Sequence, residues 1–167
     1  KKIFTSRKSN SIDLFSLEDE DEIAFEPISL PNNFKFFIQD FNLKNPDVRD
    51  VFNYAKKRGI SKHKLHILRA GYCLNDELSR YLILPSYDKD GNLNYYVSRN
   101  IDADTSHSFK YKNANVPKKL IIFNEINIDW TAPLTIVEGP LDLLKTNDNA
   151  TCLLGSSLTE DMKLFQE

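Results

Sequence analysis

Glu138 stands where a strand is expected to end, directly before Gly139, and Asp142 follows four residues later. The apolar run Leu134–Val137 before it predicts a parallel strand buried on both faces. Ligands of open α/β sheets bind at the carboxyl ends of strands, and a glycine there lets the chain turn sharply. A carboxylate in this position could hold Mg²⁺ or move a proton in phosphoryl transfer. The spacing also fits two acids that only stabilise the start of the next helix, so both interpretations stay open.

Charge is distributed unevenly along the 167 residues, although the net charge at pH 7 is only −2. Residues 1–40 carry a net −3, residues 41–125 carry +6 and residues 126–167 carry −5. A basic middle followed by an acidic end is expected to offer one surface to polyanions and another to cations. The length allows one compact domain or two small ones, and a chain with 41% apolar and 28% charged residues is expected to be globular.

Two short helices are predicted in the first half of the chain. Asn45 is a capping residue, and Pro46 follows it at the first helical position. Apolar residues then recur at i, i+3, i+4 and i+7, which makes one buried face, and Gly59 ends the helix. Ser61 caps a second helix. The expected bounds are Pro46–Arg58 and Lys62–Arg69.

A small, mostly antiparallel sheet is predicted to follow the helices. Tyr81–Tyr87 and Leu93–Arg99 are apolar, β-rich runs on either side of the turn 88–92, which predicts a hairpin. Short strands are also expected at Phe109–Tyr111 and Leu120–Phe123.

The last third of the chain is predicted to begin a parallel α/β unit. The strand Leu134–Val137 is followed by a helix at Leu141–Lys145 and by a second buried strand at Thr151–Leu154. A further helix is expected to start at Thr159, with acidic residues in its first turn.

The remaining features of the sequence do not indicate a functional site. Residues 1–31 show no sustained period and include an acidic run from Glu18 to Glu22, so we expect a linker or a surface arm. Cys73 and Cys152 are too few for a disulfide framework or a zinc site and are expected to be reduced and buried. No apolar run reaches the roughly 20 residues of a membrane helix and no signal peptide is visible, so a cytoplasmic protein without membrane contact is expected.

The residues around Glu138 resemble a known motif. Residues 134–142, Leu-Thr-Ile-Val-Glu-Gly-Pro-Leu-Asp, resemble the first motif of the Toprim domain, which bacterial-type primases, type IA and II topoisomerases and some nucleases share. Residues 154–161, Leu-Gly-Ser-Ser-Leu-Thr-Glu-Asp, are similar to the second strand and helix of primase Toprim domains.

Three upstream segments resemble primases as well. Residues 54–61, Tyr-Ala-Lys-Lys-Arg-Gly-Ile-Ser, resemble the primase helix that ends in a basic Arg-Gly-Leu-Ser step. Residues 80–99 resemble the basic hairpin of primases, and residues 110–113 resemble their Lys-Tyr-Leu-Asn segment. The five motifs stand in the family's order over about residues 45–165. The chain is therefore similar to DNA primases of the bacterial and T4-like phage type.

The resemblance implies an α+β fold. Residues 32–130 would form the basic N-terminal subdomain of the primase core, with a helix pair and a small, mostly antiparallel sheet. Residues 131–167 would form the truncated start of an α/β Toprim domain, and residues 1–31 would be the linker or arm.

The resemblance also implies a function: synthesis of short RNA primers from nucleoside triphosphates on a single-stranded DNA template, with a replicative helicase as partner. Glu138 matches the catalytic glutamate and would hold Mg²⁺, with Asp142 as a further candidate ligand. Phosphoryl transfer depends mainly on positioning and charge stabilisation, which suits cations on phosphates and carboxylates on a metal. The residues that match the groove for template, nucleotides or primer are Arg58, Arg80, Arg99, Lys110, Tyr111 and Lys112.

Two parts of that family fall outside residues 1–167. A zinc-binding domain precedes the core, and an acidic pair lies on a later Toprim strand. We therefore expect no zinc here and further Mg²⁺ ligands outside this chain, and we expect the 167 residues alone to be inactive.

Two other classes of protein stay open. Another Toprim protein, such as a nuclease or topoisomerase fragment, would keep Glu138 but would not need the primase-like helix and hairpin. A non-catalytic single-strand binding module would place aromatic residues such as Tyr95 and Tyr111 on an exposed basic sheet.

Overall fold

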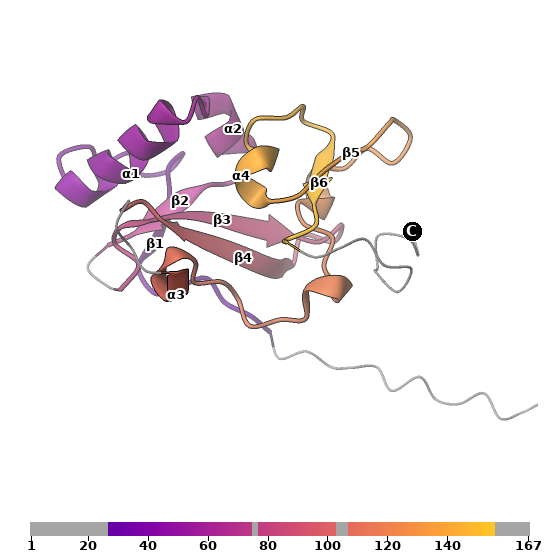
Figure 1. Ribbon diagram of the computed structural model, residues 1–167, viewed down its shortest axis with the longest axis horizontal. Helices are drawn as coiled ribbons and strands as arrows, with labels where there is room; N and C mark the ends of the chain where they lie inside the picture. Colours follow the sequence, from indigo (N-terminus) through magenta and orange to yellow (C-terminus); the bar gives the residue numbers. More distant parts are fainter. Residues whose placement is uncertain (1–26, 75–76, 103–106, 156–167) are drawn as a thin grey trace, which may run out of the picture.

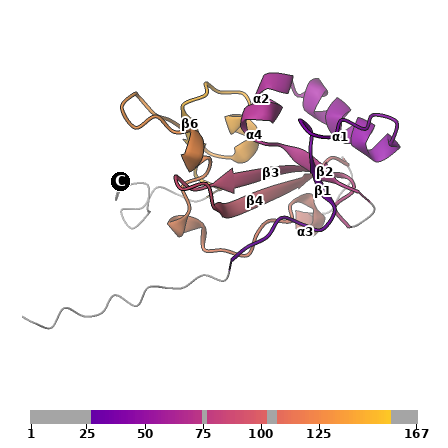
Figure 2. The same ribbon diagram turned by 180° about the vertical axis from the view of Figure 1, so that it is seen from behind.

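The computed structural model describes residues 27–74, 77–102 and 107–155, which form two sheets and several short helices (Figure 1). The four-stranded antiparallel sheet has the order β1-β2-β3-β4, and the two-stranded parallel sheet has β5 beside β6. Helices α1, α2 and α4 lie on one side of the larger sheet and α3 lies on the other (Figures 1 and 2). The strands are β1 (Phe34–Phe36), β2 (Gly71–Cys73), β3 (Tyr81–Tyr87), β4 (Leu93–Asn100), β5 (Thr135–Val137) and β6 (Ala150–Cys152).

The helix pair is confirmed with its caps. In α1 (Pro46–Lys57), the Asn45 side-chain oxygen accepts hydrogen bonds from the backbone N–H groups of the first turn at 2.9 and 3.3 Å. Gly59 follows α1 at a φ of +74°, the left-handed conformation that glycine adopts readily. In α2 (Lys62–Ile67), Ser61 Oγ caps the helix. This helix ends two residues before the predicted Arg69, because Arg69 itself takes a positive φ of 49°.

The predicted hairpin is also confirmed. β3 and β4 pair from Tyr81 opposite Asn100 to the turn, with a bulge between Ser86 and Tyr87. Asp88 closes the turn by accepting the backbone N–H groups of two residues that follow it, and Gly91 completes it at a φ of +86°.

Two strands were missed because each is only three residues long, too short for a visible period. β1 pairs with β2, and the two complete one edge of the sheet. The tight approach is possible because β2 begins with Gly71: a Cβ there would overlap the Lys35 carbonyl oxygen and the Phe34 ring.

Two predicted strands were wrong. The region of residues 109–111 is instead the end of the short helix α3 (His107–Lys110), followed by a single bridge between Tyr111 and Arg99. At residues 120–123, the 3₁₀ helix η1 (Lys118–Leu120) ends and a buried turn follows it. Ile121, Ile122 and Phe123 are buried without strand pairing, and Ile121 and Phe123 belong to the same core cluster as residues of the hairpin. The apolar run alone could not distinguish a buried turn from a strand.

The parallel strand–helix–strand unit is confirmed, with shorter elements. α4 (Pro140–Leu143) is a single turn between β5 and β6, which pair in parallel. β6 is fully buried, but β5 is not buried on both faces as predicted, since Ile136 is 40% exposed. The predicted helix from Thr159 lies outside the described residues, and so do residues 1–26 of the predicted arm. Cys73 and Cys152 are buried and form no disulfide, as expected.

The two sheets share one hydrophobic core and are tied by buried hydrogen bonds. Asn124 stands at a φ of 66° before the 3₁₀ helix η2 (Glu125–Asn127). Its backbone N–H donates to Ser86 Oγ at 2.9 Å, and its side-chain amide donates to the Ala150 carbonyl at 3.0 Å. Thr151 Oγ1 donates to the Phe123 carbonyl at 2.7 Å. These bonds hold β6 against the hairpin. No helix in the described ranges has the length and hydropathy to cross a membrane.

Candidate active site

A pocket of about 430 Å³ lies where the two sheets meet. One wall consists of Glu138, Gly139 and Asp142 at the exit of β5, and Gly155 follows β6 beside them. The other wall includes Tyr111, Asn113 and Lys118 from the segment that follows β4. The structure therefore brings both predicted carboxylates and one predicted groove residue, Tyr111, to one cavity.

The exit of β5 gives Glu138 its position. Parallel pairing of β5 with β6 continues past Val137, whose carbonyl accepts the Leu153 N–H at 3.0 Å, and the Glu138 carbonyl accepts the Gly155 N–H at 3.2 Å. Gly139 then precedes Pro140 at the start of α4, so the chain turns away and the Glu138 side chain is exposed. Asp142, in the first turn of α4, is exposed as well, and a Cβ built on Gly139 would lie 3.7 Å from its Oδ2.

The opposite wall is held by β4. Lys112 N–H donates to the Ser98 carbonyl at 3.0 Å, Ala114 N–H donates to the Tyr96 carbonyl at 3.1 Å, and Asn113 Oδ1 accepts the Ser98 N–H at 3.2 Å. Successive side chains of an extended segment point to opposite sides. Tyr111 and Asn113 consequently line the pocket, and Lys112 does not.

Lys118 is a pocket residue that the sequence reasoning missed. Its Nζ donates to the Leu154 carbonyl at 3.0 Å, so it joins the two walls across the pocket. Lys118 stands in a run of two lysines without a recognisable motif, and only the folded chain brings it near Glu138. Asn113, the other missed residue, is the last of residues 110–113, the segment that resembles Lys-Tyr-Leu-Asn of primases, and could have been found there.

Four side chains form a cation–aromatic row that runs from the end of α1 to this pocket: Arg58, Tyr54, Arg99 and Tyr111. The Arg58 guanidinium lies 4.9 Å from the centroid of the Tyr54 ring. The Tyr54 hydroxyl accepts a hydrogen bond from Arg99 Nε at 3.3 Å, and the Arg99 guanidinium lies 4.8 Å from the centroid of the Tyr111 ring. The row links two predicted basic residues to the pocket through a tyrosine that the sequence reasoning did not single out.

Arg80 does not join that row. Its guanidinium contacts three carboxylates: Asp47 at 2.9 Å, Asp50 at 3.2 Å and Asp102 at 2.8 Å. Hydrogen bonds to Asp102 and Asp47 raise the pKa of Arg80 above its usual range, and the guanidinium lowers the pKa of Asp102. The network ties the first turn of α1 to the sheet, which is a structural task.

The two predicted lysines differ in their surroundings. Lys112 Nζ lies 2.6 Å from Glu77 Oε2, and this hydrogen bond lowers the pKa of the Glu77 carboxyl. Lys110 ends α3 and is half-buried. Neither lysine lines the pocket that contains Glu138.

The chemistry that the pocket can support is that of carboxylates and cations. Burial raises the pKa of the nearby Cys152 thiol to about 12, so this cysteine is a neutral thiol near pH 7 and a poor nucleophile. Within the described ranges, no group of three or more His, Cys, Asp or Glu residues could hold a metal ion. Two exposed carboxylates do fit part of an Mg²⁺ shell, because Mg²⁺ in phosphoryl-transfer sites commonly takes one or two carboxylates with water and substrate phosphates.

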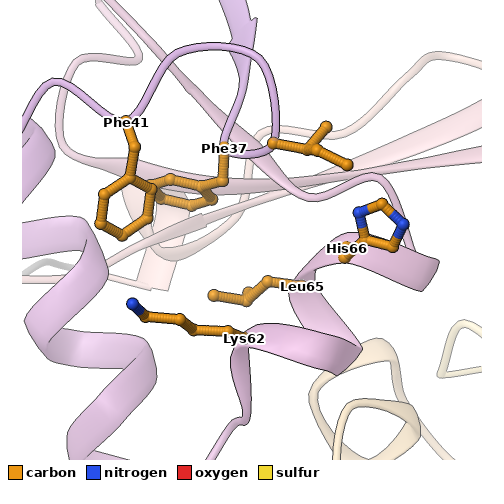
Figure 3. A pocket seen from close by; sticks show the side chains of 6 residues that line it. Phe37, Phe41, Lys62, Leu65 and His66 are labelled. Atoms are coloured by element: carbon orange, nitrogen blue, oxygen red, sulfur yellow. The ribbon is translucent and has the colours of Figure 1, made fainter.

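A second cavity lies apart from this pocket, on the side of α2 (Figure 3). It has a volume of about 230 Å³ and lies between the loop after β1, which contributes Phe37 and Phe41, and α2, which contributes Lys62, Leu65 and His66 (Figure 3). The Lys62 ammonium lies 5.4 Å from the centroid of the Phe41 ring. The lining is mainly apolar and contains no carboxylate, so this cavity lacks the groups that Mg²⁺-dependent chemistry needs.

Comparison with known proteins shows the fold. No protein-family model matches the sequence, and no curated protein matches it. The Escherichia coli primase catalytic core is similar over 73% of this chain and 53% of that chain, at 21% identity and a TM-score of 0.57. The DnaG primase catalytic domain bound to ssDNA is similar over 74% of this chain and 52% of that one, at 20% identity and a TM-score of 0.58.

The Aquifex aeolicus primase, solved with its zinc-binding and RNA polymerase domains, is similar over 72% of this chain and 40% of that chain, at 22% identity and a TM-score of 0.57. This chain thus spans about half the length of the first matched structures, or less. The described residues have a mixed α+β fold, with a four-stranded antiparallel sheet and a small parallel sheet, that is similar to part of the DnaG primase catalytic core.

Proposed function

We propose that these residues are part of the RNA-polymerase core of a DNA primase, which joins nucleoside triphosphates into short RNA primers on a single-stranded DNA template. The observation that carries the proposal is the pocket at the junction of the sheets, where Glu138 and Asp142 face Tyr111, Asn113 and Lys118. The primase-core fold supports it, and one matched structure is described as bound to ssDNA.

Each side of the pocket has a role in this proposal. Glu138 and Asp142 would hold Mg²⁺, which neutralises charge on the phosphate oxygens when it is bound. Lys118 would contact the triphosphate, because its ammonium is the cation that lines the same cavity. Tyr111, a residue that is 40% exposed, would stack on a base, and Arg58 and Arg99 would contact strand phosphates.

The finer assignments belong to the same proposal. Residues 32–130 would be the N-terminal subdomain of the core and residues 131–167 the start of a Toprim domain. The protein would act in replication in the cytoplasm, in an infected cell if it is of phage origin, beside a replicative helicase.

The test is primer synthesis by the full-length protein with Glu138→Gln, which removes the charge and keeps the shape. Synthesis on single-stranded DNA with ribonucleotides and Mg²⁺ should fall by two orders of magnitude or more, while the melting temperature should change little because Glu138 is exposed. Asp90→Asn, an exposed carboxylate in the hairpin turn, is the matched control and should keep full activity.

Unchanged synthesis by Glu138→Gln would contradict the proposal and leave the carboxylate a helix-capping role. A protein that makes no primers but binds single strands, and binds them better after Glu138→Lys, would instead be a non-catalytic binding module. The exposed Tyr111 suits that module, but Tyr95 does not, since it is 1% exposed and cannot stack on a base.

A further inference from the structure

The cation–aromatic row contains two arginines whose charge is not neutralised within the described residues. No carboxylate there forms an ion pair with Arg58 or Arg99, whereas Arg80 contacts three. Arg58 is exposed, and Arg99 is half-buried with its Nη1 buried and without a hydrogen-bond partner. Such a group costs about 1–3 kcal/mol when it is left unsatisfied, so the position of Arg99 calls for an explanation beyond stability.

Tyr54 is the residue that holds both arginines. It lies in the last turns of α1, half-buried, and packs against the hydrophobic core, so its ring has a fixed position. One face of the ring supports the Arg58 guanidinium, and the hydroxyl oxygen accepts the Arg99 Nε–H. A neutral phenol orients the two guanidinium groups without cancelling their charge, which an aspartate or glutamate at this position would do.

The row also has a direction. Its last member, Tyr111, pairs with Arg99 through the isolated backbone bridge and lines the pocket that contains Glu138. A strand whose phosphates follow Arg58 and then Arg99 would arrive at the pocket beside an exposed aromatic ring. Alternating cations and rings are the arrangement that binds a single nucleic-acid strand without reading its sequence.

We propose that Tyr54 is a positioning residue, which rests on the proposed function: it orients Arg58 and Arg99 so that both contact phosphates of one single strand on its way to the Glu138 pocket. In Arg99 the Nε–H donates to the Tyr54 hydroxyl and Nη1 is buried, so Nη2 is the remaining nitrogen for a phosphate, and its direction depends on how Tyr54 holds the guanidinium. Tyr54 itself contacts no phosphate in this proposal and acts through the two arginines.

The experiment measures the salt dependence of binding. Fluorescein-labelled single-stranded DNA is titrated with the 167-residue chain at several NaCl concentrations, and the slope of log K against log [salt] counts phosphate contacts at about 0.7 per contact. Tyr54→Phe removes only the hydroxyl and should make the slope shallower by about 0.7, through Arg99. Tyr54→Leu removes the ring as well and should make it shallower by about 1.4.

A matched control exists elsewhere in the fold. The Arg69 guanidinium lies 4.9 Å from the centroid of the Tyr87 ring, a cation–aromatic pair of the same geometry that does not line the Glu138 pocket. Tyr87→Phe and Tyr87→Leu should leave the slope unchanged. The double variant Tyr54→Phe/Arg99→Ala should have the same salt slope as Arg99→Ala alone, because both changes remove the same phosphate contact.

The outcomes separate the two proposals. A wild-type chain that binds with a steep slope, together with Tyr54 variants of the same slope, overturns the role of Tyr54 and leaves the proposed function standing. A lower melting temperature with an unchanged slope shows a merely structural role and also overturns it. A wild-type chain without salt-dependent binding overturns the nucleic-acid part of the proposed function. Tyr54→Phe keeps the ring and its packing, so it decides the question even if Tyr54→Leu does not fold.

Discussion

The ammonium group of Lys118 lies 3.0 Å from the carbonyl oxygen of Leu154, a residue 36 positions later in the chain. This bond crosses the pocket that contains Glu138, from the segment after β4 to the exit of β6. It fixes a cation at the edge of a site whose other wall is acidic.

Lys118→Met should therefore weaken nucleotide binding more than it weakens the fold. The variant keeps the aliphatic chain but loses the charge, so we expect at least a tenfold loss in nucleoside triphosphate affinity, measured by calorimetry with Mg²⁺ in the full-length protein. The melting temperature should fall by a few degrees at most, because Lys118 is exposed. Lys145→Met, an exposed lysine after α4, is the control; an equal loss in both variants would contradict a specific role for Lys118.

Arg80→Ala should lower stability and leave strand binding intact. Three partly exposed carboxylates lose a shared partner, and pairs near the surface contribute about 0.2–1 kcal/mol each, so we expect a loss of about 1–2 kcal/mol in urea unfolding at pH 7. The salt slope of single-strand binding should stay that of the wild type. A shallower slope would show that Arg80 contacts phosphate after all.

The Arg80 network also predicts a pH dependence. Arg80 holds the pKa of Asp102 below its ordinary value of 3.8, so this contribution to stability is full above about pH 4 and is lost as the pH falls through the lower, folded-state pKa. The difference in unfolding free energy between wild type and Arg80→Ala should therefore shrink below about pH 4. A difference that stays constant down to pH 2 would show that packing, not the ion pairs, accounts for it.

Lys110 and Lys112 should behave differently, although both belong to one predicted basic segment. Lys112 is engaged with Glu77 at 2.6 Å, so removing it takes away less free positive charge. Lys110→Ala should make the salt slope of single-strand binding shallower by about 0.7, and Lys112→Ala should change it less. Equal changes in the anisotropy titration would contradict this distinction.

Gly71→Ala should destabilise the fold strongly. The added Cβ would overlap the Lys35 carbonyl oxygen and the Phe34 ring, and the backbone oxygen cannot move without breaking the pairing of β1 with β2. We expect a loss of about 2 kcal/mol or more, at the upper end of overpacking costs. Gly139→Ala is the control for stability, because its Cβ would find only Asp142 Oδ2 at 3.7 Å. A wild-type melting temperature for Gly71→Ala would show that the strands can separate freely.

Elements with local signals could be predicted from the sequence. The side chain of Asn45, the proline after it and the Asp88 turn act within a few residues, and the structure has them as expected. The β1–β2 pair and the buried turn at Phe123 depend on contacts between distant segments, and no local pattern encodes those.

The candidate site divides in the same way. The strand–helix spacing predicted that Glu138 and Asp142 lie together, and in the structure both line one pocket with Tyr111. The separation of Arg80 from Arg99 could not be predicted, because it depends on three carboxylates from two distant parts of the chain. Lys118 and Tyr54 were missed for the same reason, since their roles arise only from partners 36 and 45 residues away.

Asn124 and Thr151 tie the parallel sheet to the hairpin through buried hydrogen bonds. Asn124 bonds Ser86 of β3 at 2.9 Å and Ala150 of β6 at 3.0 Å, and Thr151 Oγ1 donates to the Phe123 carbonyl at 2.7 Å. The segments that carry Glu138 and Tyr111 therefore belong to one hydrogen-bonded unit with a shared core. In the proposed function, a single strand would adapt its own sugar–phosphate path to walls that are joined in this way. Tolerance for different template sequences would then come from the flexibility of the bound strand rather than from movement of the pocket walls.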